Sequence, residues 1–175
     1  MANDDHADFS SYQLGREHPT IEVDTSAAVS AACNALFSQA TRDILIMSRD
    51  LDPKVFDNPE TSLALRTFLL RSRHVRLRIL VKDAEPVARR GHRVVELTQR
   101  LSSFAEIRVP APEFKSHNTA FVVVDATGMV YRGQADRYEA TVTFADRKLA
   151  REAVRQFDEI WQTSLSPASL RRMSL

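Results

Sequence analysis

The chain has 175 residues, of which 43% are hydrophobic and 27% are charged. These values are typical of a single globular domain and unlike those of a disordered or fibrous chain. No apolar run approaches the roughly 20 residues that cross a bilayer, and the N-terminus is acidic where a secretory signal would be basic and then apolar. We therefore expect a cytoplasmic protein without a membrane span.

Charge is balanced over the whole chain but unevenly distributed along it. The 24 Lys and Arg residues against 23 Asp and Glu residues give a net charge of +1, which by itself offers no argument for binding to nucleic acid. Residues 1–24 are acidic, whereas residues 71–100 are basic with few acids between them. Cys33 is the only cysteine, so no internal disulfide can form, and its apolar helical position predicts a small core residue.

The predicted organisation has three parts. Residues 1–22 mix small, polar and charged types without a sustained period, so we predict a flexible acidic leader outside the fold. An α/β domain over residues 23–164 follows. Residues 165–175 are expected to form a short polar tail.

Helices and strands alternate in the first half of the predicted domain. Asp24 and Thr25 are candidate N-caps of a helix whose apolar residues, within 29–37, share one face. Residues 44–47 are apolar at both odd and even positions, which predicts a strand covered on both faces. The next elements are a loop over 48–58, a helix from Pro59, a strand over 75–81, a helix after Pro86 and a short strand around Ile107 and Val109.

The last third of the chain contains consecutive strands. Residues 120–124 and 129–131 predict a hairpin joined by a turn at 126–128. Residues 140–144 alternate as a further strand, and an amphipathic helix includes residues 149–161. The order α-β-α-β-α-β-β-β-β-α predicts an α/β fold with a mixed, mainly parallel sheet flanked by helices.

This order of elements resembles one repeat of the phospholipase D superfamily. Residues 75–81 look like the second strand of that family, and residues 121–128 look like the strand that carries its signature. Residues 133–136 lie where the family has a Gly-Ser-x-Asn turn, and residues 138–161 resemble its last strand and helix. The resemblance covers about residues 24–164 and is to single-repeat bacterial members of unassigned function.

The resemblance implies a phosphodiesterase signature, H-x-K-x4-D, which this chain does not preserve. In the family a His attacks phosphorus, a Lys neutralises phosphate oxygens and the Asp orients a His. Alignment on Asp125 places Asn118 at the His position and Ala120 at the Lys position. Alignment on His117 instead places Val124 at the Asp position. Because neither register gives the triad, we expect the standard mechanism to be absent.

Three residues are candidates for a rebuilt catalytic site. His117 lies in a polar stretch and is either a surface-loop histidine or a displaced base or ligand-binding donor with Asp125 or Glu139 nearby. Asp125 precedes Ala-Thr-Gly and is either a turn former or an acidic partner of His117. Glu139 begins a strand where the family often carries a functional acid, and it is also consistent with a plain surface residue.

Candidates for ligand binding lie in loops of the predicted sheet. Arg49 and Asp50 follow the carboxyl end of a strand, where open α/β sheets bind ligands, although Asp50 and Asp52 before a proline also describe an ordinary turn. Asn118 lies at the mouth of the expected site. No cluster has metal-ligand spacing, so we predict neither a metal nor a cofactor.

The remaining ligand-binding candidates are basic. His92 and Arg93 belong to a basic helical segment, which is either a solvated face or, together with Arg132, an anion-binding surface.

We therefore expect a non-catalytic phospholipase D-like module that binds a small anionic ligand or a protein partner. One alternative is a phosphodiesterase or phosphotransferase of altered mechanism, using His117 or His92 with Glu139 and Arg132. Another is a nucleic-acid-binding accessory protein, which the basic middle favours and its few aromatic residues disfavour. The two-repeat architecture of the family also implies a homodimer through a face near residues 115–139.

Overall fold

The computed structural model describes residues 7–171 and contains one sheet of seven strands. The strands are β1 (Ile21–Val23), β2 (Asp43–Ser48), β3 (Arg76–Val81), β4 (Ala105–Arg108), β5 (Ala120–Val124), β6 (Gly128–Arg132) and β7 (Ala140–Thr143). The helices are α1 (Ser26–Phe37), α2 (Pro53–Phe56), α3 (Pro59–Leu69), α4 (Glu85–Arg90), α5 (Arg93–Arg100), α6 (Arg147–Thr163) and α7 (Ala168–Arg171), with a 3₁₀ turn η1 (Pro112–Phe114). None of the helices in this part of the chain is long and apolar enough to cross a membrane.

The strand order is β1-β7-β6-β5-β2-β3-β4. Strands β2, β3 and β4 are parallel, whereas the other neighbouring pairs are antiparallel. The mixed α/β sheet that the sequence predicts is confirmed, but its parallel part is confined to three strands. The reason is that β5, β6 and β7 follow one another through a hairpin and a loop, and such connections join antiparallel neighbours.

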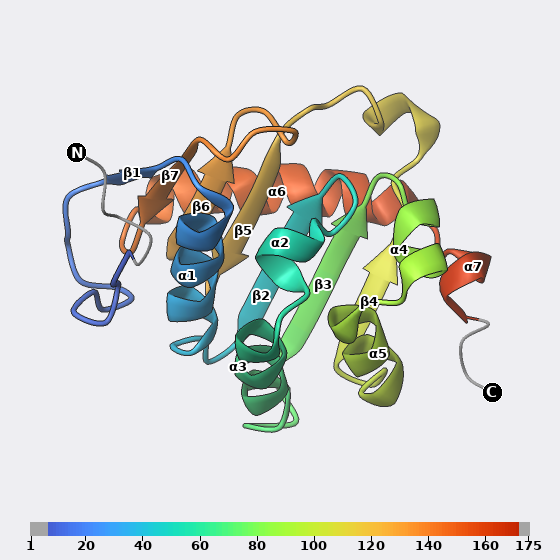
Figure 1. Cartoon of the computed structure of the whole chain (residues 1–175), viewed down its shortest axis with the longest axis horizontal. Coiled ribbons are helices and arrows are strands. Elements are labelled where there is room, and N and C mark those ends of the chain that lie inside the picture. Colours follow the sequence, from blue (N-terminus) through green and yellow to red (C-terminus); the bar gives the residue numbers. More distant parts are fainter. Residues whose placement is uncertain (1–6, 172–175) are drawn as a thin grey trace.

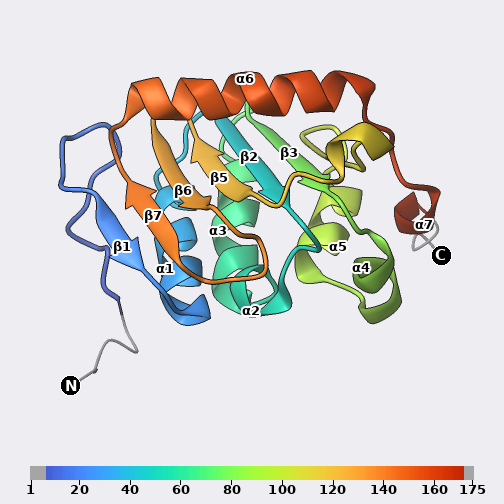
Figure 2. The same cartoon turned by 90° about the horizontal axis from the view of Figure 1, so that it is seen from above.

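Each face of the sheet carries its own core. Ile44 and Ile46 of β2 pack with α1, α3 and α5 on one face, whereas Leu45 and Met47 pack with α6 on the other. The helices lie on the two sides accordingly, with α6 on the side opposite α1, α3 and α5 (Figures 1 and 2). Cys33 is buried in α1, as predicted.

Local signals set the helix boundaries. The hydroxyl of Thr25 accepts the Ala28 N–H at 3.1 Å at the start of α1, and Asn58 caps α3 directly before Pro59. One predicted boundary is wrong, because the helix expected after Pro86 is two helices. Gly91 has a φ of 70° between them, and this left-handed residue ends α4 before α5 begins.

The segment that we expected to lie outside the fold packs on the domain over its described part. Phe9 is only 5% exposed, and its ring centroid lies 5.9 Å from that of Tyr12 and 6.3 Å from that of Phe144. Residues 21–23 pair with β7 as strand β1. The aromatic residues of this segment have no helical or strand period, which is why their burial could not be predicted. Residues 1–6 of the predicted leader lie outside the described residues.

The predicted tail also contacts the domain. The backbone of Leu165 pairs with that of Val109 through hydrogen bonds of 2.8 and 3.0 Å, which covers part of the free edge of β4. Leu170 of α7 is 6% exposed and belongs to the same core as α4 and α5.

Candidate functional site

The loops that follow β2, β3 and β6 and those that precede β5 and β7 meet at one edge of the sheet. The strand register places them there, because Met47 near the end of β2 faces Phe121 near the start of β5, and Arg132 at the end of β6 faces Ala120. Ligands of open α/β sheets bind at the carboxyl ends of such strands.

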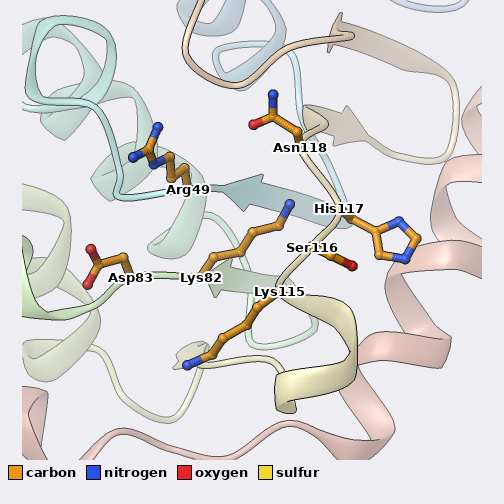
Figure 3. Close-up of a pocket in the computed structure, with 7 residues that line it drawn as sticks. All are labelled: Arg49, Lys82, Asp83, Lys115, Ser116, His117 and Asn118. Atoms are coloured by element: carbon orange, nitrogen blue, oxygen red, sulfur yellow. The ribbon is translucent and has the colours of Figure 1, made fainter.

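A pocket of about 370 Å³ opens at this edge (Figure 3). Its size is at the lower end of the range for small-molecule sites. We call it the edge pocket, and its lining residues are Arg49, Lys82, Asp83, Lys115, Ser116, His117 and Asn118.

Backbone pairing places Arg49 beside Lys82. Ser48 and Val81 are partners in the β2–β3 ladder. The ladder continues past both strands, because the Lys82 N–H donates to the Ser48 carbonyl at 3.1 Å and the Asp83 N–H donates to the Arg49 carbonyl at 2.7 Å. Adjacent positions of paired strands point their side chains to the same face. The two cations are therefore held at the rim of the pocket by the sheet itself.

The edge pocket is electropositive. Within residues 7–171, none of the ion pairs includes Arg49, Lys82 or Lys115. The Lys82 ammonium donates to the Thr119 carbonyl at 3.5 Å, and burial lowers its pKa. The single carboxylate of the lining, Asp83, points away from Lys82 in Figure 3. An anion entering the pocket would therefore meet cations that no carboxylate of the described chain pairs with.

His117 and Glu139 do not form a catalytic pair. The ring of His117 is exposed and points away from Arg49 and Lys82 (Figure 3). Its closest described ring neighbour is Phe114, at 6.3 Å between centroids. Glu139 is exposed before β7. Among the described residues neither side chain has a hydrogen-bonded acid or base partner, so the two are not arranged as the base and acid of one site.

Asp125 lies at the opposite edge of the sheet. Its carboxylate accepts the N–H groups of Thr41, Arg42 and Asp43 at 2.8, 2.8 and 2.9 Å, and the Thr41 hydroxyl at 3.0 Å. With a φ of 52°, Asp125 forms the β5–β6 turn. The expected proximity to His117 is wrong, because the five residues of β5 separate the two. Asp125 is the turn former that the sequence left as one alternative.

His92 and Arg93 are engaged within the protein and do not line the edge pocket. His92 is 4% exposed; its Nδ1 accepts the Val94 N–H at 3.1 Å, so its Nε2 carries the proton donated to the Leu51 carbonyl at 3.0 Å. Burial lowers the pKa of His92, which favours this neutral form. Arg93 forms an ion pair of 3.1 Å with Asp57. The anion-binding surface proposed from these residues is therefore not formed.

Arg132 is likewise buried in protein contacts. Its Nε donates to the Arg137 carbonyl at 2.8 Å and its Nη2 to the Ala135 carbonyl at 2.9 Å, while its guanidinium lies 5.1 Å from the Tyr138 ring centroid. Tyr138 donates to Asp52 at 2.7 Å, and burial together with this bond raises the pKa of Tyr138 to about 12. Arg132 and Tyr138 thus fix the β6–β7 loop against the loop that carries Arg49.

Of the ligand-binding candidates from the sequence, the structure brings Arg49 and Asn118 to the edge pocket. Asp50 is half-buried next to Arg49 but does not line the pocket. Sequence reasoning missed Lys82 and Lys115 as site residues. The signal for Lys82 was its position directly after a strand that neighbours the one preceding Arg49. No three His, Cys, Asp or Glu side chains within residues 7–171 gather as a metal site.

A family model described as "Domain of unknown function (DUF7931)" matches residues 25–173. The chain belongs to this family. The match extends across every described element after β1. No curated protein has a significantly similar sequence.

Solved structures place this DUF7931 domain among phospholipase D-like folds. Nuc from Salmonella typhimurium, a phospholipase D family member, is 13% identical with a TM-score of 0.59, over 85% of this chain and 96% of Nuc. NucT from Helicobacter pylori is 10% identical with a TM-score of 0.61, over 85% of this chain and 99% of NucT. TrmBL2, an archaeal chromatin protein, is 12% identical with a TM-score of 0.63, and the 86% of this chain that matches spans only 54% of TrmBL2. The likeness confirms the half-phospholipase D fold expected from the element order.

Proposed function

We propose that this DUF7931 domain is a non-catalytic phospholipase D-like module that binds a phosphate-type anion in the edge pocket. The observation that carries the proposal is the grouping of Arg49, Lys82 and Lys115, unpaired within the described chain, around a pocket with the single carboxylate of Asp83. Guanidinium and ammonium groups are the side chains that bind phosphate oxygens in proteins.

The residues around the pocket support binding without turnover. Asn118 and Ala120 stand where the resemblance places the His and Lys of the signature, and neither side chain can replace the lost group. The alternative enzyme of altered mechanism would need a free His92 or Arg132, and both are held in hydrogen bonds to backbone groups. His117 has no acid beside it in the described chain.

Thermal unfolding across phosphate, pyrophosphate, sulfate and chloride at equal ionic strength tests the proposal. A probe at ten times its Kd stabilises the folded chain by about 1.4 kcal/mol, which raises the Tm of a chain of this size by about 3–6 °C. We expect phosphate or pyrophosphate to do so and the variant R49Q/K82Q to lose the response.

The control for this test is K54Q/R90Q. It removes the same charge from exposed residues that do not line the edge pocket, and we expect it to keep the response. A flat response of the unmodified chain, or an unchanged response of R49Q/K82Q, would contradict the proposal and leave a protein partner as the ligand to seek.

We also infer a homodimer through the face near residues 115–139. The inference comes from the resemblance to a two-repeat family. Its support in this chain is that this face includes the edge pocket residues 115–118 and the partly exposed ring of Tyr131. Light scattering at high protein concentration tests it, and a strictly monomeric mass there would contradict it.

A further inference from the structure

Helix α6 carries a row of exposed arginines. Arg147, Arg151 and Arg155 are spaced by four residues, so they project from the same side of the helix about 6 Å apart along its axis. Figure 2 shows α6 running along the outer side of the sheet, away from the other helices that cover it. The apolar side of α6, with Phe157 and Ile160, packs on the sheet. The arginine row therefore faces outward on an otherwise uncovered side of the molecule.

The row is not neutralised by the protein. No ion pair within residues 7–171 includes any of the three arginines. From Arg147 to Arg155 the helix has four cations, counting Lys148, and Glu152 as its only acid. The rest of α6 has two acids and no cation; of these acids, Asp158 forms an ion pair of 2.9 Å with Arg78 of β3.

This arrangement opposes the stability of the helix. The amino end of a helix carries partial positive charge, so Arg147, in the first turn of α6, is unfavourably placed. Arginines four residues apart also repel one another. The stability of the helix therefore gives no reason for the row, whereas binding of a polyanion would.

We propose that the arginine row of Arg147, Arg151 and Arg155 binds the phosphate backbone of a nucleic acid. The planar guanidinium fork suits phosphate oxygens, and evenly spaced cations match a ligand with evenly spaced charges. An anionic membrane fits less well, because surface-binding helices insert their apolar side and that side of α6 is buried. None of the three arginines lines the edge pocket, so this site is independent of the proposed anion site.

Fluorescence anisotropy with a labelled 20-base-pair duplex DNA and the matching single strand, between 50 and 200 mM NaCl, tests the proposal. Three phosphate contacts contribute about −2.7 to the slope of log K against log salt on a duplex and about −2.1 on a single strand. We expect R147Q/R151Q/R155Q to lose that contribution, and each single variant to lose about 0.9 on the duplex. Glutamine keeps a helix propensity close to that of arginine, so the fold is retained.

The control R16Q/K54Q/R66Q removes the same charge from exposed residues that lie outside α6 and outside the basic segment 71–100. We expect it to change the slope by less than about 0.5, because a loss common to both triple variants would reflect net charge alone. An equal loss in the two triple variants would overturn the proposal, as would failure of the unmodified chain to bind either DNA. Binding to phosphatidylserine vesicles without binding to DNA would also overturn it and assign the row to a membrane surface.

Discussion

Replacing Asp125 tests whether this acid acts in the fold or in the site. Its carboxylate accepts the backbone N–H groups of Thr41, Arg42 and Asp43 and joins the β5–β6 turn to the start of β2. Asp125→Ala leaves those three donors without their partner and places alanine at a φ of 52°, which favours Asn, Asp or Gly. Asp125→Asn keeps one acceptor oxygen and tolerates the same φ.

The expected loss follows from these contacts. A hydrogen bond to a charged group contributes about 1.5–3 kcal/mol, but Thr41, Arg42 and Asp43 are exposed residues and water can replace part of each bond, so we take about 1 kcal/mol for each amide. With about 1 kcal/mol for the backbone strain, Asp125→Ala should reduce the free energy of unfolding by about 4 kcal/mol. Asp125→Asn should reduce it by about 1.5 kcal/mol, since one acceptor remains.

Urea unfolding followed by circular dichroism measures both values. Glu152→Gln, an exposed substitution on α6, should change the free energy of unfolding by less than about 0.5 kcal/mol. Binding of pyrophosphate should be the same for Asp125→Asn as for the unmodified chain, because Asp125 lies at the edge opposite the pocket. A loss below about 1 kcal/mol in Asp125→Ala, or weaker pyrophosphate binding in Asp125→Asn, would refute the assignment.

Three further predictions concern the stability of other parts of the fold. Burial lowers the pKa of His92, so the unfolded chain binds the proton first as the pH falls below about 6.5. The free energy of unfolding should therefore decline from there until the pH passes the pKa of His92 in the folded state. Urea unfolding between pH 7.5 and 5 should show a smaller decline for His92→Asn. Gly128→Ala places a Cβ 2.6 Å from Leu14 Cδ1, so it should reduce the free energy of unfolding by about 1–3 kcal/mol in the same assay. Because the clash is with Leu14, the further change Leu14→Ala should restore part of that loss. Tyr138→Phe removes the bond to Asp52 and should lower the free energy of unfolding by about 1 kcal/mol, whereas the partly exposed Tyr131 should tolerate the same change. An equal loss in the two variants would contradict the role of Tyr138 in fixing the β6–β7 loop.

The sequence predicts the elements that have strong periodic patterns. A run of apolar residues at both odd and even positions predicts strand β2, and a long amphipathic pattern predicts α6. Strand β1 could not be predicted, because Ile21–Val23 is only three residues long and exists through its pairing with β7. The break at Gly91 was visible as a residue type, but the basic residues around it favoured a continuous helix. Pairing and backbone dihedrals depend on the whole fold.

The candidate site was predicted only in part for a related reason. Arg49 and Asn118 could be found from their positions at strand ends. Lys82 joined them only through the register of β2 with β3, which sequence patterns do not specify. His92 was expected on a charged helix surface. It is buried instead, because its ring caps the start of α5 and donates a hydrogen bond to the Leu51 carbonyl. Its neighbours in sequence are exposed, so local charge was misleading.

The central claim is that the edge pocket holds a phosphate-type anion without reacting with it. Phosphorus NMR of bis-p-nitrophenyl phosphate with the purified chain reports binding and hydrolysis in one sample. We predict a phosphorus signal that broadens or shifts with added protein and stays that of the intact diester over days. When the variant R49Q/K82Q is added instead, the signal should neither broaden nor shift. Appearance of the monoester at a rate above buffer, abolished by His117→Ala, would contradict the account.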